Sequence, residues 1–565
     1  MAYVIKKLIN GKPYYYLKQS KRVGSKVVSK NIAYFGKKKP TKKEIEEKLK
    51  SVEPKKEIKE EVVVPKEIQE KPQQDKAFKP EQKTQAMNIN DMAVFCKKKG
   101  FIFQNSEIYG GMAGFFDYGH LGVELKNNIK EAFWNTFVKQ REDIVGIDGT
   151  IITHPMVWKA SGHVDSFTDY IYRCDKCNIT LKGDNEQGLK CHKCNEDMKN
   201  EGKFNLMFET QVGPVKGNIS YLRPETAQLI FTNYKLVQES ARKKLPFGIA
   251  QTGKAFRNEI SPRDFLFRSR EFEQFEIEFF VHPNKVNECP FINEVGDMKV
   301  QLLTQDNQKN NEGHIELTIK EIIDKKIASS WHAYWLAKYC QFFIDLGIKK
   351  ENIRLREHLK DELAHYAKAC FDIEYNFPFG WKEIHGNADR GQFDLKQHME
   401  FSKTNLEYFD EETKEKVMPY VASEPSQGID RAFLAFLFDA YNYDNERGNI
   451  VLKLHPKLAP IKIGVFPLVN KLENEAKEIF DELKKEFAAI YDRSGSIGRR
   501  YARADEIGIP YCITVDFDSL KNKDVTIRDL LTTKQIRVKI KDLKGIIRGL
   551  IESEVKFEEL LKNQK

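Results

Sequence analysis

Arginine and carboxylate side chains gather between residues 247 and 281, in two strand-like runs joined by a polar turn. Residues two apart in a strand share a face, so one face of the second run carries Phe272, Gln274, Glu276 and Glu278. Guanidinium groups hold phosphate oxygens in a bidentate manner, and carboxylates take an ammonium group or a metal ion. We therefore expect a polyphosphate site beside a cation site. The alternative is an exposed antiparallel face with weak cross-strand ion pairs.

A second candidate lies where a helix is expected to begin, in the stretch from 424 to 441. The apolar spacing from Ile429 onward predicts a buried helix, and Gly428 permits a tight entry into it. Arg431 falls in the first turn, where the helix dipole disfavours a cation. A bound phosphate would reverse this balance, because the helix N-terminus and Arg431 both attract an anion. The alternative is that Asp430 or another carboxylate neutralises Arg431.

Four of the nine cysteines form two C-x2-C pairs separated by thirteen residues, namely Cys174, Cys177, Cys191 and Cys194. This spacing is typical of a closed, tetrahedral and structural zinc site. Four free thiols in an insertion are the alternative. The other five cysteines are scattered, so the chain does not carry a disulfide framework.

Length and composition indicate a folded protein of several domains. A chain of 565 residues with 41% hydrophobic residues is expected to form three or four domains. The net charge of +10 favours a polyanionic partner without requiring one. No apolar run approaches the roughly 20 residues that span a bilayer, and the N-terminus lacks the apolar core of a signal peptide. These features point to a cytoplasmic protein that does not enter a membrane.

Composition changes along the chain predict its domains. Residues 1–50 read as a basic, β-rich extension with a hairpin at Asn10–Gly11; its tyrosines, Tyr14 to Tyr16, suggest RNA binding or simply packing. Thr41 is a candidate N-cap for a short charged helix. The remaining predicted parts are a flexible linker at 51–87, a large domain at 88–457 with insertions at 172–203 and 284–345, and an α/β domain at 458–565 with a partly parallel sheet. We interpret the Asn/Gln/Lys-rich part of the second insertion as an insertion or a mobile loop.

Several separated motifs resemble those of one enzyme family. FRNE at 256–259 with FRSREFEQFEIEF at 267–279 resembles the second signature motif of class II aminoacyl-tRNA synthetases, and GIDR at 428–431 resembles the third. From about residue 88 to 565, the chain is similar to homodimeric glycyl-tRNA synthetases. Four further motifs carry this similarity: RPETAQ at 223–228, SEIYGG at 106–111, WKASGHV at 158–164 and KKLPFGIAQ at 243–251. The resemblance implies an α+β fold whose catalytic domain is built on an antiparallel sheet.

The resemblance also implies an activity, in which the enzyme activates glycine with ATP and transfers it to the 3′-terminal adenosine of tRNA(Gly). Arg257, Glu259 and Arg431 are the expected catalytic residues, with Arg257 on the α-phosphate and Arg431 on the far phosphate. Glu383 is expected to act through Mg²⁺. The full set implied for ATP is Arg257, Asn258, Glu259, Phe267, Arg268, Ser269, Arg270, Glu271, Phe272, Glu383, Ile384, Gly428, Ile429, Asp430 and Arg431.

For glycine, the resemblance implies a small acidic pocket whose crowded floor excludes a methyl group. The implied residues are Glu225, Phe272, Glu273, Gln274, Phe275, Glu276, Glu424, Pro425, Ser426, Gln427 and Gly428. In the family, the segment that here holds the zinc-site cysteines lies over the acceptor end of tRNA. The segment 491–516 is similar to the anticodon-binding domain, where Arg499 and Arg500 suit phosphate or base contacts.

The chain departs from the family pattern at two places within the resemblance. DYGHLG has His120 where the family has proline, which bears on the dimer-forming region. An arginine that often follows the first cysteine pair is not evident, and Lys182 is the nearest cation. Two other functions remain open at this stage: a class II synthetase for another small amino acid, and a synthetase-derived RNA-binding protein that has lost catalysis.

Overall fold

In a computed structural model, the chain is described except for residues 1, 10–11, 24–25, 37–38, 42–44, 46–86, 184–187, 215–216, 218, 365 and 564–565. The predicted helix after Thr41 and almost all of the predicted linker lie outside the described residues. The chain divides into two compact units, residues 1–84 and 85–565. Within the described part of the chain, no helix combines the length and the apolarity needed to cross a membrane.

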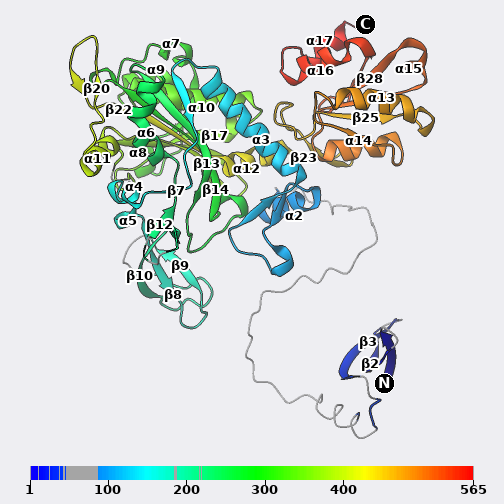
Figure 1. The fold of residues 1–565 in the computed structure, drawn as a ribbon. Coiled ribbons are helices and arrows are strands. Elements are labelled where there is room, and N and C mark those ends of the chain that lie inside the picture. The colour runs from blue at the N-terminus through cyan, green and yellow to red at the C-terminus, as the bar shows by residue number, and fades with distance from the viewer. Residues whose placement is uncertain are drawn as a thin grey trace. The chain divides into compact units, whose positions relative to one another are not determined.

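The N-terminal unit contains a three-stranded antiparallel sheet in the order β1-β2-β3, drawn in dark blue in Figure 1. Its strands are β1 (Ala2–Ile9), β2 (Lys12–Val23) and β3 (Lys26–Gly36). Ile9 pairs with Lys12, so only Asn10 and Gly11 separate the first two strands. The predicted hairpin is confirmed.

A nine-stranded sheet organises the second unit, in the order β16-β15-β17-β18-β19-β22-β14-β13-β6. Neighbouring strands are antiparallel except for the pairs β13–β6 and β15–β17, so the expected antiparallel core is confirmed. The strands are β6 (Ile144–Ile147), β13 (Phe247–Phe256), β14 (Glu271–Val281), β15 (Lys299–Leu303), β16 (Ile315–Thr318), β17 (Ile353–Glu357), β18 (Ala369–Phe377), β19 (Gly380–Asp389) and β22 (Tyr420–Gly428).

The two faces of this sheet differ in what covers them. Phe275 and Ile277 on β14 belong to a large apolar core with helices α3 (His120–Trp134), α10 (Ser330–Asp345) and α12 (Ile429–Ala440). On the other face, Ile249 and Phe280 pack in a smaller cluster with α6 (Ala227–Ser240) and α11 (Phe393–Ser402). That cluster covers one end of the second face, which leaves the polar end of β14 for a site.

The interpretation of the region after residue 284 as a mobile loop is wrong. Residues 284–330 supply two strands of the large sheet, β15 and β16, and lead into the buried helix α10, which is labelled in Figure 1; their interpretation as an insertion stays a prediction. The polar residues of this segment lie between these elements, at α8 (Gln305–Lys309) and the following turn, whereas Val300, Leu302 and Leu317 are buried. The overall polarity of the segment concealed short strands with few apolar positions each.

The four-cysteine segment and the C-terminal part form separate sheets. The cysteines flank β8 (Thr168–Arg173), β9 (Thr180–Gly183) and β10 (Lys199–Asn205), in the order β10-β8-β9. The C-terminal sheet has the order β26-β25-β27-β28-β29, with β25 parallel to both of its neighbours, which confirms the partly parallel sheet. Its elements are β25 (Ile463–Pro467), α13 (Glu473–Leu483), β26 (Ala489–Tyr491), α14 (Ile497–Glu506), β27 (Tyr511–Val515), β28 (Asp524–Asp529), β29 (Gln535–Lys539) and α16 (Leu543–Ile551).

One predicted RNA contact in the C-terminal sheet domain is wrong. Arg500 on α14 is only 3% exposed, and its guanidinium donates a hydrogen bond of 2.5 Å to the carbonyl of Pro467. It therefore joins α14 to the end of β25. Its neighbour Arg499 is exposed and stays a predicted contact.

Candidate active site

A row of polar positions crosses four neighbouring strands at the uncovered end of the sheet. Gln251 pairs with Glu276, Glu276 with Ser426, and Ser426 with Gly386, so the four positions share one face. A Cβ added to Gly386 would make ordinary van der Waals contacts with Glu383 at 3.8 Å and Asp372 at 3.9 Å, so the row ends beside two more carboxylates. Strand alternation thus assembles residues that are far apart in sequence.

Glu276 is the centre of this row, and it is 2% exposed. Its carboxylate accepts hydrogen bonds from Gln274 Nε2 at 2.8 Å, from Ser426 Oγ at 2.7 Å and from Thr226 N at 2.9 Å. Burial raises the pKa of Glu276, and the nearby carboxylate of Glu225 raises it further. A solvated, ion-paired face is therefore excluded, because these polar groups are buried and directed inward.

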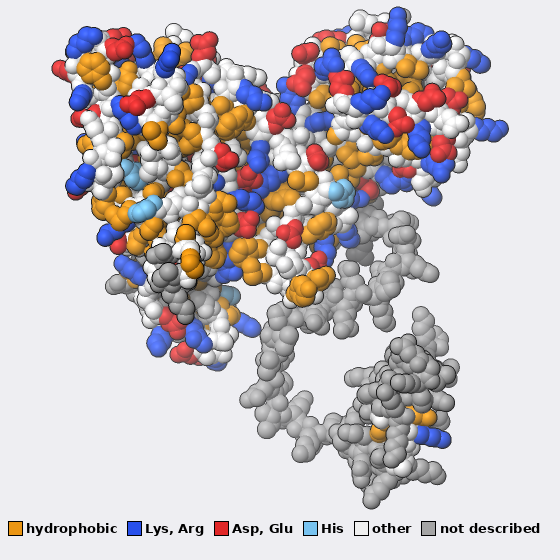
Figure 2. Space-filling model, in the orientation of Figure 1, with side chains coloured by type: hydrophobic (Ala, Val, Ile, Leu, Met, Phe, Trp, Pro, Cys, Tyr) orange, Lys and Arg blue, Asp and Glu red, His pale blue; other side chains and the backbone are white. Residues whose placement is uncertain are grey.

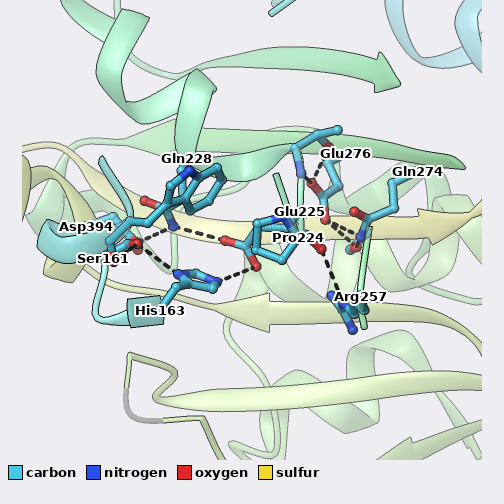
Figure 3. A network of polar contacts seen from close by, with 12 residues as sticks. Ser161, His163, Pro224, Glu225, Gln228, Arg257, Gln274, Glu276 and Asp394 are labelled. Carbon is cyan, nitrogen blue, oxygen red and sulfur yellow. Dashed lines mark hydrogen bonds and ion pairs between the residues drawn. The ribbon is translucent and has the colours of Figure 1, made fainter. Parts of the chain in front are cut away.

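Glu225 continues the polar network toward the helices, as Figure 3 shows. It accepts a hydrogen bond of 3.0 Å from Gln228, and His163 Nε2 lies 3.4 Å from its carboxylate. Burial opposes ionisation of Glu225, but His163 and then Arg390 outweigh burial and lower its pKa. The Ser161 hydroxyl in turn lies 2.8 Å from the other ring nitrogen of His163 and orients that ring.

The floor behind this network is rich in carboxylates. Arg390 is 1% exposed, binds Asp394 through two nitrogens at 2.8 and 2.9 Å, and donates to Glu424 at 2.7 Å. Burial raises the pKa of Glu424 to about 8, although Arg390 acts in the opposite direction. Glu278 is fully buried, has no hydrogen-bond partner in the described structure, and has a pKa raised well above its usual value by burial and then by Glu424. Such a floor attracts a small cation.

A cleft opens beside Glu276, with an empty volume of about 620 Å³ that includes the open solvent at its mouth. It is lined by Arg257, Glu259, Leu266, Phe267, Arg268, Ser269, Phe272, Gln274, Glu383, Ser426, Gly428, Asp430 and Arg431. Most of the residues predicted for ATP are in this set. Gln274 and Ser426 line the cleft and also bind Glu276, so the cleft and the acidic pocket share a wall.

The three arginines of the cleft are held in different ways. Arg257 donates from Nε to the carbonyl of Pro224 at 3.1 Å and lies over the ring of Phe272. Arg268 donates to Glu259 at 2.7 Å. Arg431 lies 2.9 Å from the Glu383 carboxylate. A carboxylate other than Asp430 therefore pairs with Arg431.

Some predicted ATP residues lie outside the cleft lining. Ile384 and Ile429 are fully buried in the large core, so their side chains cannot contact a nucleotide. Arg270 donates to the backbone carbonyls of Glu259 and Ala113, which braces the loop. Two further predicted residues are not among the lining residues, Asn258 and Glu271, the second of which pairs with Lys254 at 2.7 Å.

Four residues predicted to contact glycine face the other side of the sheet. Glu273 pairs with Lys126 at 3.0 Å and Lys130 at 2.5 Å on α3, and Phe275 packs in the large core. Pro425 and Gln427 are the neighbours of Ser426 on β22, so strand alternation places them on the other face of the sheet. These predicted side-chain contacts are wrong, because a contiguous motif in a strand supplies only every second residue to one face.

Sequence reasoning missed several parts of the site. Arg390 and Asp394 are four residues apart across the start of α11, a spacing that could have predicted their ion pair. Arg223 is 2% exposed and donates to the carbonyls of Lys254 at 2.6 Å and Gly149 at 2.8 Å. No local pattern predicts the contact between His163 and Glu225, since it depends on the tertiary fold.

The four cysteines meet at one point, with all Sγ atoms within 4.8 Å of one another. Zinc–sulfur bonds of about 2.3 Å in a tetrahedron place neighbouring sulfurs about 3.8 Å apart, and Cys174 Sγ lies 3.5 Å from Cys194 Sγ. Hydrogen bonds from the backbone of Lys193 and then Cys194 lower the pKa of Cys191 to about 7, which favours a thiolate. The donor set fits a structural zinc ion.

Comparisons with known proteins agree with this geometry. A family model described as "tRNA synthetase class II core domain (G, H, P, S and T)" matches residues 216–291, and one described as "Anticodon binding domain" matches residues 462–550. The chain is 44% identical over 487 residues to a glycine–tRNA ligase of Caldanaerobacter subterraneus subsp. tengcongensis, covering 80% of this chain and 96% of that one. It is 45% identical over 500 residues to a glycine–tRNA ligase of Clostridium acetobutylicum, covering 82% and 99%.

Solved structures match at lower identity and show the fold alone. A prolyl-tRNA synthetase from Cryptosporidium parvum superposes with a TM-score of 0.51 at 14% identity, covering 82% of this chain and 75% of that one. A structure described as the RNA-binding domain of threonyl-tRNA synthetase from Cryptosporidium parvum Iowa II gives a TM-score of 0.53 at 16% identity, covering 82% and 98%.

Proposed function

This chain belongs to the glycine–tRNA ligases, which are class II aminoacyl-tRNA synthetases, and from that membership we propose how its residues divide the work. The cleft beside Phe272 binds ATP. The acidic pocket around Glu225 and Glu276 binds glycine. The observation that carries this proposal is the wall shared by the two compartments, because Gln274 and Ser426 line the cleft while binding Glu276.

In the first half of the reaction, a carboxylate oxygen of glycine attacks the α-phosphorus of ATP, and pyrophosphate leaves. Arg257 stabilises the charge that develops on the α-phosphate, as a fixed group that needs no reorganisation. Arg431 holds the far phosphate, and Arg268 is positioned by Glu259. Mg²⁺ would neutralise phosphate charge when bound, and Glu383 and Glu259 are the oxygen ligands in the cleft that would hold it.

The glycine ammonium group is held by carboxylates of the pocket. Glu276 is fixed by its hydrogen bonds to Gln274 and Ser426, and Glu225 by its contacts with Gln228 and His163. A hydrophobic pocket discriminates one methylene by only about 1–3 kcal/mol. Discrimination against alanine therefore rests on steric exclusion in this closely packed polar pocket.

In the second half, the hydroxyl of the 3′-terminal ribose of tRNA(Gly) attacks the glycyl carbonyl carbon, and AMP leaves. The four-cysteine segment, stabilised by zinc, contacts the acceptor end. The C-terminal sheet domain binds the anticodon region, in agreement with the matched family model. The proposed catalytic domain spans residues 88–457, and the proposed anticodon-binding domain spans residues 458–565.

The enzyme is proposed to act as a cytoplasmic homodimer. Support for a second copy comes from an exposed apolar loop near the start of the catalytic domain, where Ile108 is 87% exposed, Tyr109 86% and Met112 51%. Exposed large apolar side chains that cluster mark interaction surfaces. Light scattering should give twice the mass of the 65.8 kDa chain.

Pyrophosphate exchange with a panel of amino acids tests the function. Glycine should support exchange, whereas alanine, serine, threonine and proline should not. Exchange with serine and not glycine would overturn the assignment, and exchange with none of them would favour an RNA-binding protein without catalysis. The presence of Arg257, Glu259 and Arg431 around one cleft argues against that last outcome.

A further inference from the structure

The net positive charge of this protein comes from its first 40 residues. The whole chain has 93 basic and 83 acidic residues. Residues 1–40 contain 11 of the basic residues and no aspartate or glutamate, so 82 basic and 83 acidic residues remain for the other 525 positions. On the face drawn in Figure 2, basic and acidic side chains are interspersed over the second unit. The first 40 residues therefore carry the net positive charge of the chain, whereas the other residues are nearly neutral in sum.

Strand register separates the residues of this unit between two faces. Leu17 on β2 is fully buried, and it pairs with Val4 on β1, so both positions belong to the packed face. Because successive residues of a strand alternate between faces, Tyr14, Tyr16 and Lys18 belong to the other face.

Cross-strand pairing extends this second face over all three strands. Tyr14 pairs with Lys7, Tyr16 with Ile5 and Tyr34, and Lys18 with Tyr3. Aromatic and basic positions therefore alternate across the face that carries Tyr16. Sheets that bind RNA use this combination, with aromatic rings that stack on bases and cations that contact phosphates.

We propose that the Tyr16 face of the β1–β3 sheet binds RNA, and that its ligand in the working enzyme is the substrate tRNA. The proposal rests on the family's tRNA substrate, and it assigns to the unit a role in affinity rather than in chemistry. RNA is favoured over an acidic protein because stacking positions accompany the cations, and a protein partner would not require them.

The unit is an addition to an otherwise complete synthetase. The glycine–tRNA ligases compared above match 96–99% of their own length but only 80–82% of this chain. The active site also lies wholly within residues 85–565. Adenylate formation should therefore be independent of the Tyr16 face, whereas tRNA affinity and its salt dependence should not be.

Two full-length double variants test the proposal. Lys7→Gln with Lys18→Gln removes two charges from the Tyr16 face. Lys6→Gln with Lys21→Gln removes two charges from the Leu17 face of the same sheet, as a matched control. The dissociation constant for a tRNA(Gly) transcript is measured between 50 and 200 mM KCl, together with the KM for tRNA in aminoacylation and the rate of glycine-dependent pyrophosphate exchange.

In the Tyr16-face variant, the negative slope of log affinity against log salt concentration should become shallower by about 0.9 for each contact with a duplex phosphate that is removed. If both lysines make such a contact, the ratio of the variant's dissociation constant to that of the wild type should fall by roughly tenfold between 50 and 200 mM KCl. The control variant and pyrophosphate exchange should be unchanged. Lys7→Arg with Lys18→Arg should restore the slope, which separates lost charge from lost folding.

Three results would overturn the proposal. Equal slopes for the wild type and both glutamine variants would show that the unit does not contact tRNA. Equal losses in the two glutamine variants would show that no particular face is used. Loss of binding to an unrelated RNA duplex, with the KM for tRNA(Gly) unchanged, would show that the ligand is another RNA. Failure of glycine-dependent exchange in the wild type would instead contradict the proposed function.

Discussion

The Ser426 hydroxyl donates a hydrogen bond of 2.7 Å to Glu276 Oε1, and this bond connects the wall of the proposed ATP cleft to the buried carboxylate of the proposed glycine pocket. Ser426 lies on β22 and Glu276 on the adjacent β14, at paired positions. The bond therefore fixes the orientation of the Glu276 carboxylate, which we propose to bind glycine beside the ATP cleft.

Replacement of Ser426 by alanine should weaken glycine use specifically. A hydrogen bond to a charged group contributes about 1.5–3 kcal/mol, so kcat/KM for glycine in pyrophosphate exchange should fall by roughly 10- to 150-fold. The KM for ATP should change little, because the arginines of the cleft are untouched. Ser426→Thr, which keeps the hydroxyl, is the control. An equal rise in both KM values would contradict the assignment of Ser426 to the glycine pocket.

Arg257→Ala should nearly abolish adenylate formation. Removal of one preorganised group that stabilises charge in a transition state lowers kcat by about 10²- to 10³-fold. Arg257 is preorganised in this sense, because the carbonyl of Pro224 and the ring of Phe272 orient its guanidinium. Single-turnover formation of glycyl-adenylate measures the effect, and binding of tRNA should be unchanged. Arg257→Lys should recover only part of the rate, since an ammonium group lacks the planar fork. Adenylate formation at the wild-type rate would move the α-phosphate role elsewhere.

The sequence predicted the sheet and the cleft better than it predicted the glycine pocket. Alternation of Phe275 and Ile277 with Gln274 and Glu276 was sufficient to define β14 and its two faces. The family resemblance, however, implies contiguous motif segments for glycine binding, and these include Glu273 although the same alternation places it against α3. The contact of Glu225 with His163 could not be predicted, because the two residues are 62 positions apart and meet only through the tertiary fold.

Removal of zinc should affect transfer to tRNA and spare glycine activation. The proposed zinc ion would hold β8–β10 together through the sulfurs of Cys174, Cys177, Cys191 and Cys194, and metal binding of this kind supplies folding free energy to a small segment. Cys194→Ser should lower the zinc content from one ion per chain, measured by mass spectrometry of the metal, and should reduce aminoacylation more than pyrophosphate exchange. Cys289→Ser, at a cysteine outside the four-cysteine site, is the control. Full zinc content in Cys194→Ser would contradict the four-thiolate site.

Glycine binding should release a proton from the pocket near neutral pH. Burial raises the pKa of Glu424 to about 8, so this carboxyl is protonated in the free enzyme at pH 7. An ammonium group bound nearby favours the ionised form and lowers that pKa. Glycine affinity should therefore increase as the pH rises from 6 to 8 and level off above that range.

The effect of pH on folding stability has the opposite sign. Between the usual pKa of 4.5 and about 8, native Glu424 binds its proton more tightly than the unfolded chain does. The contribution of Glu424 to the free energy of unfolding therefore decreases as the pH rises through that window.

Calorimetric titration of glycine in two buffers with different ionisation enthalpies measures the proton release directly. Release should approach one proton per glycine at pH 7 and should be absent in Glu424→Gln, provided that this variant still binds glycine when ATP is present. Asp439 lies outside the pocket and accepts a hydrogen bond from Asn352. The Asp439→Asn variant should therefore release the same number of protons on glycine binding as the wild type. No release from the wild type at pH 7 would mean that Glu424 is already ionised against Arg390 before glycine arrives.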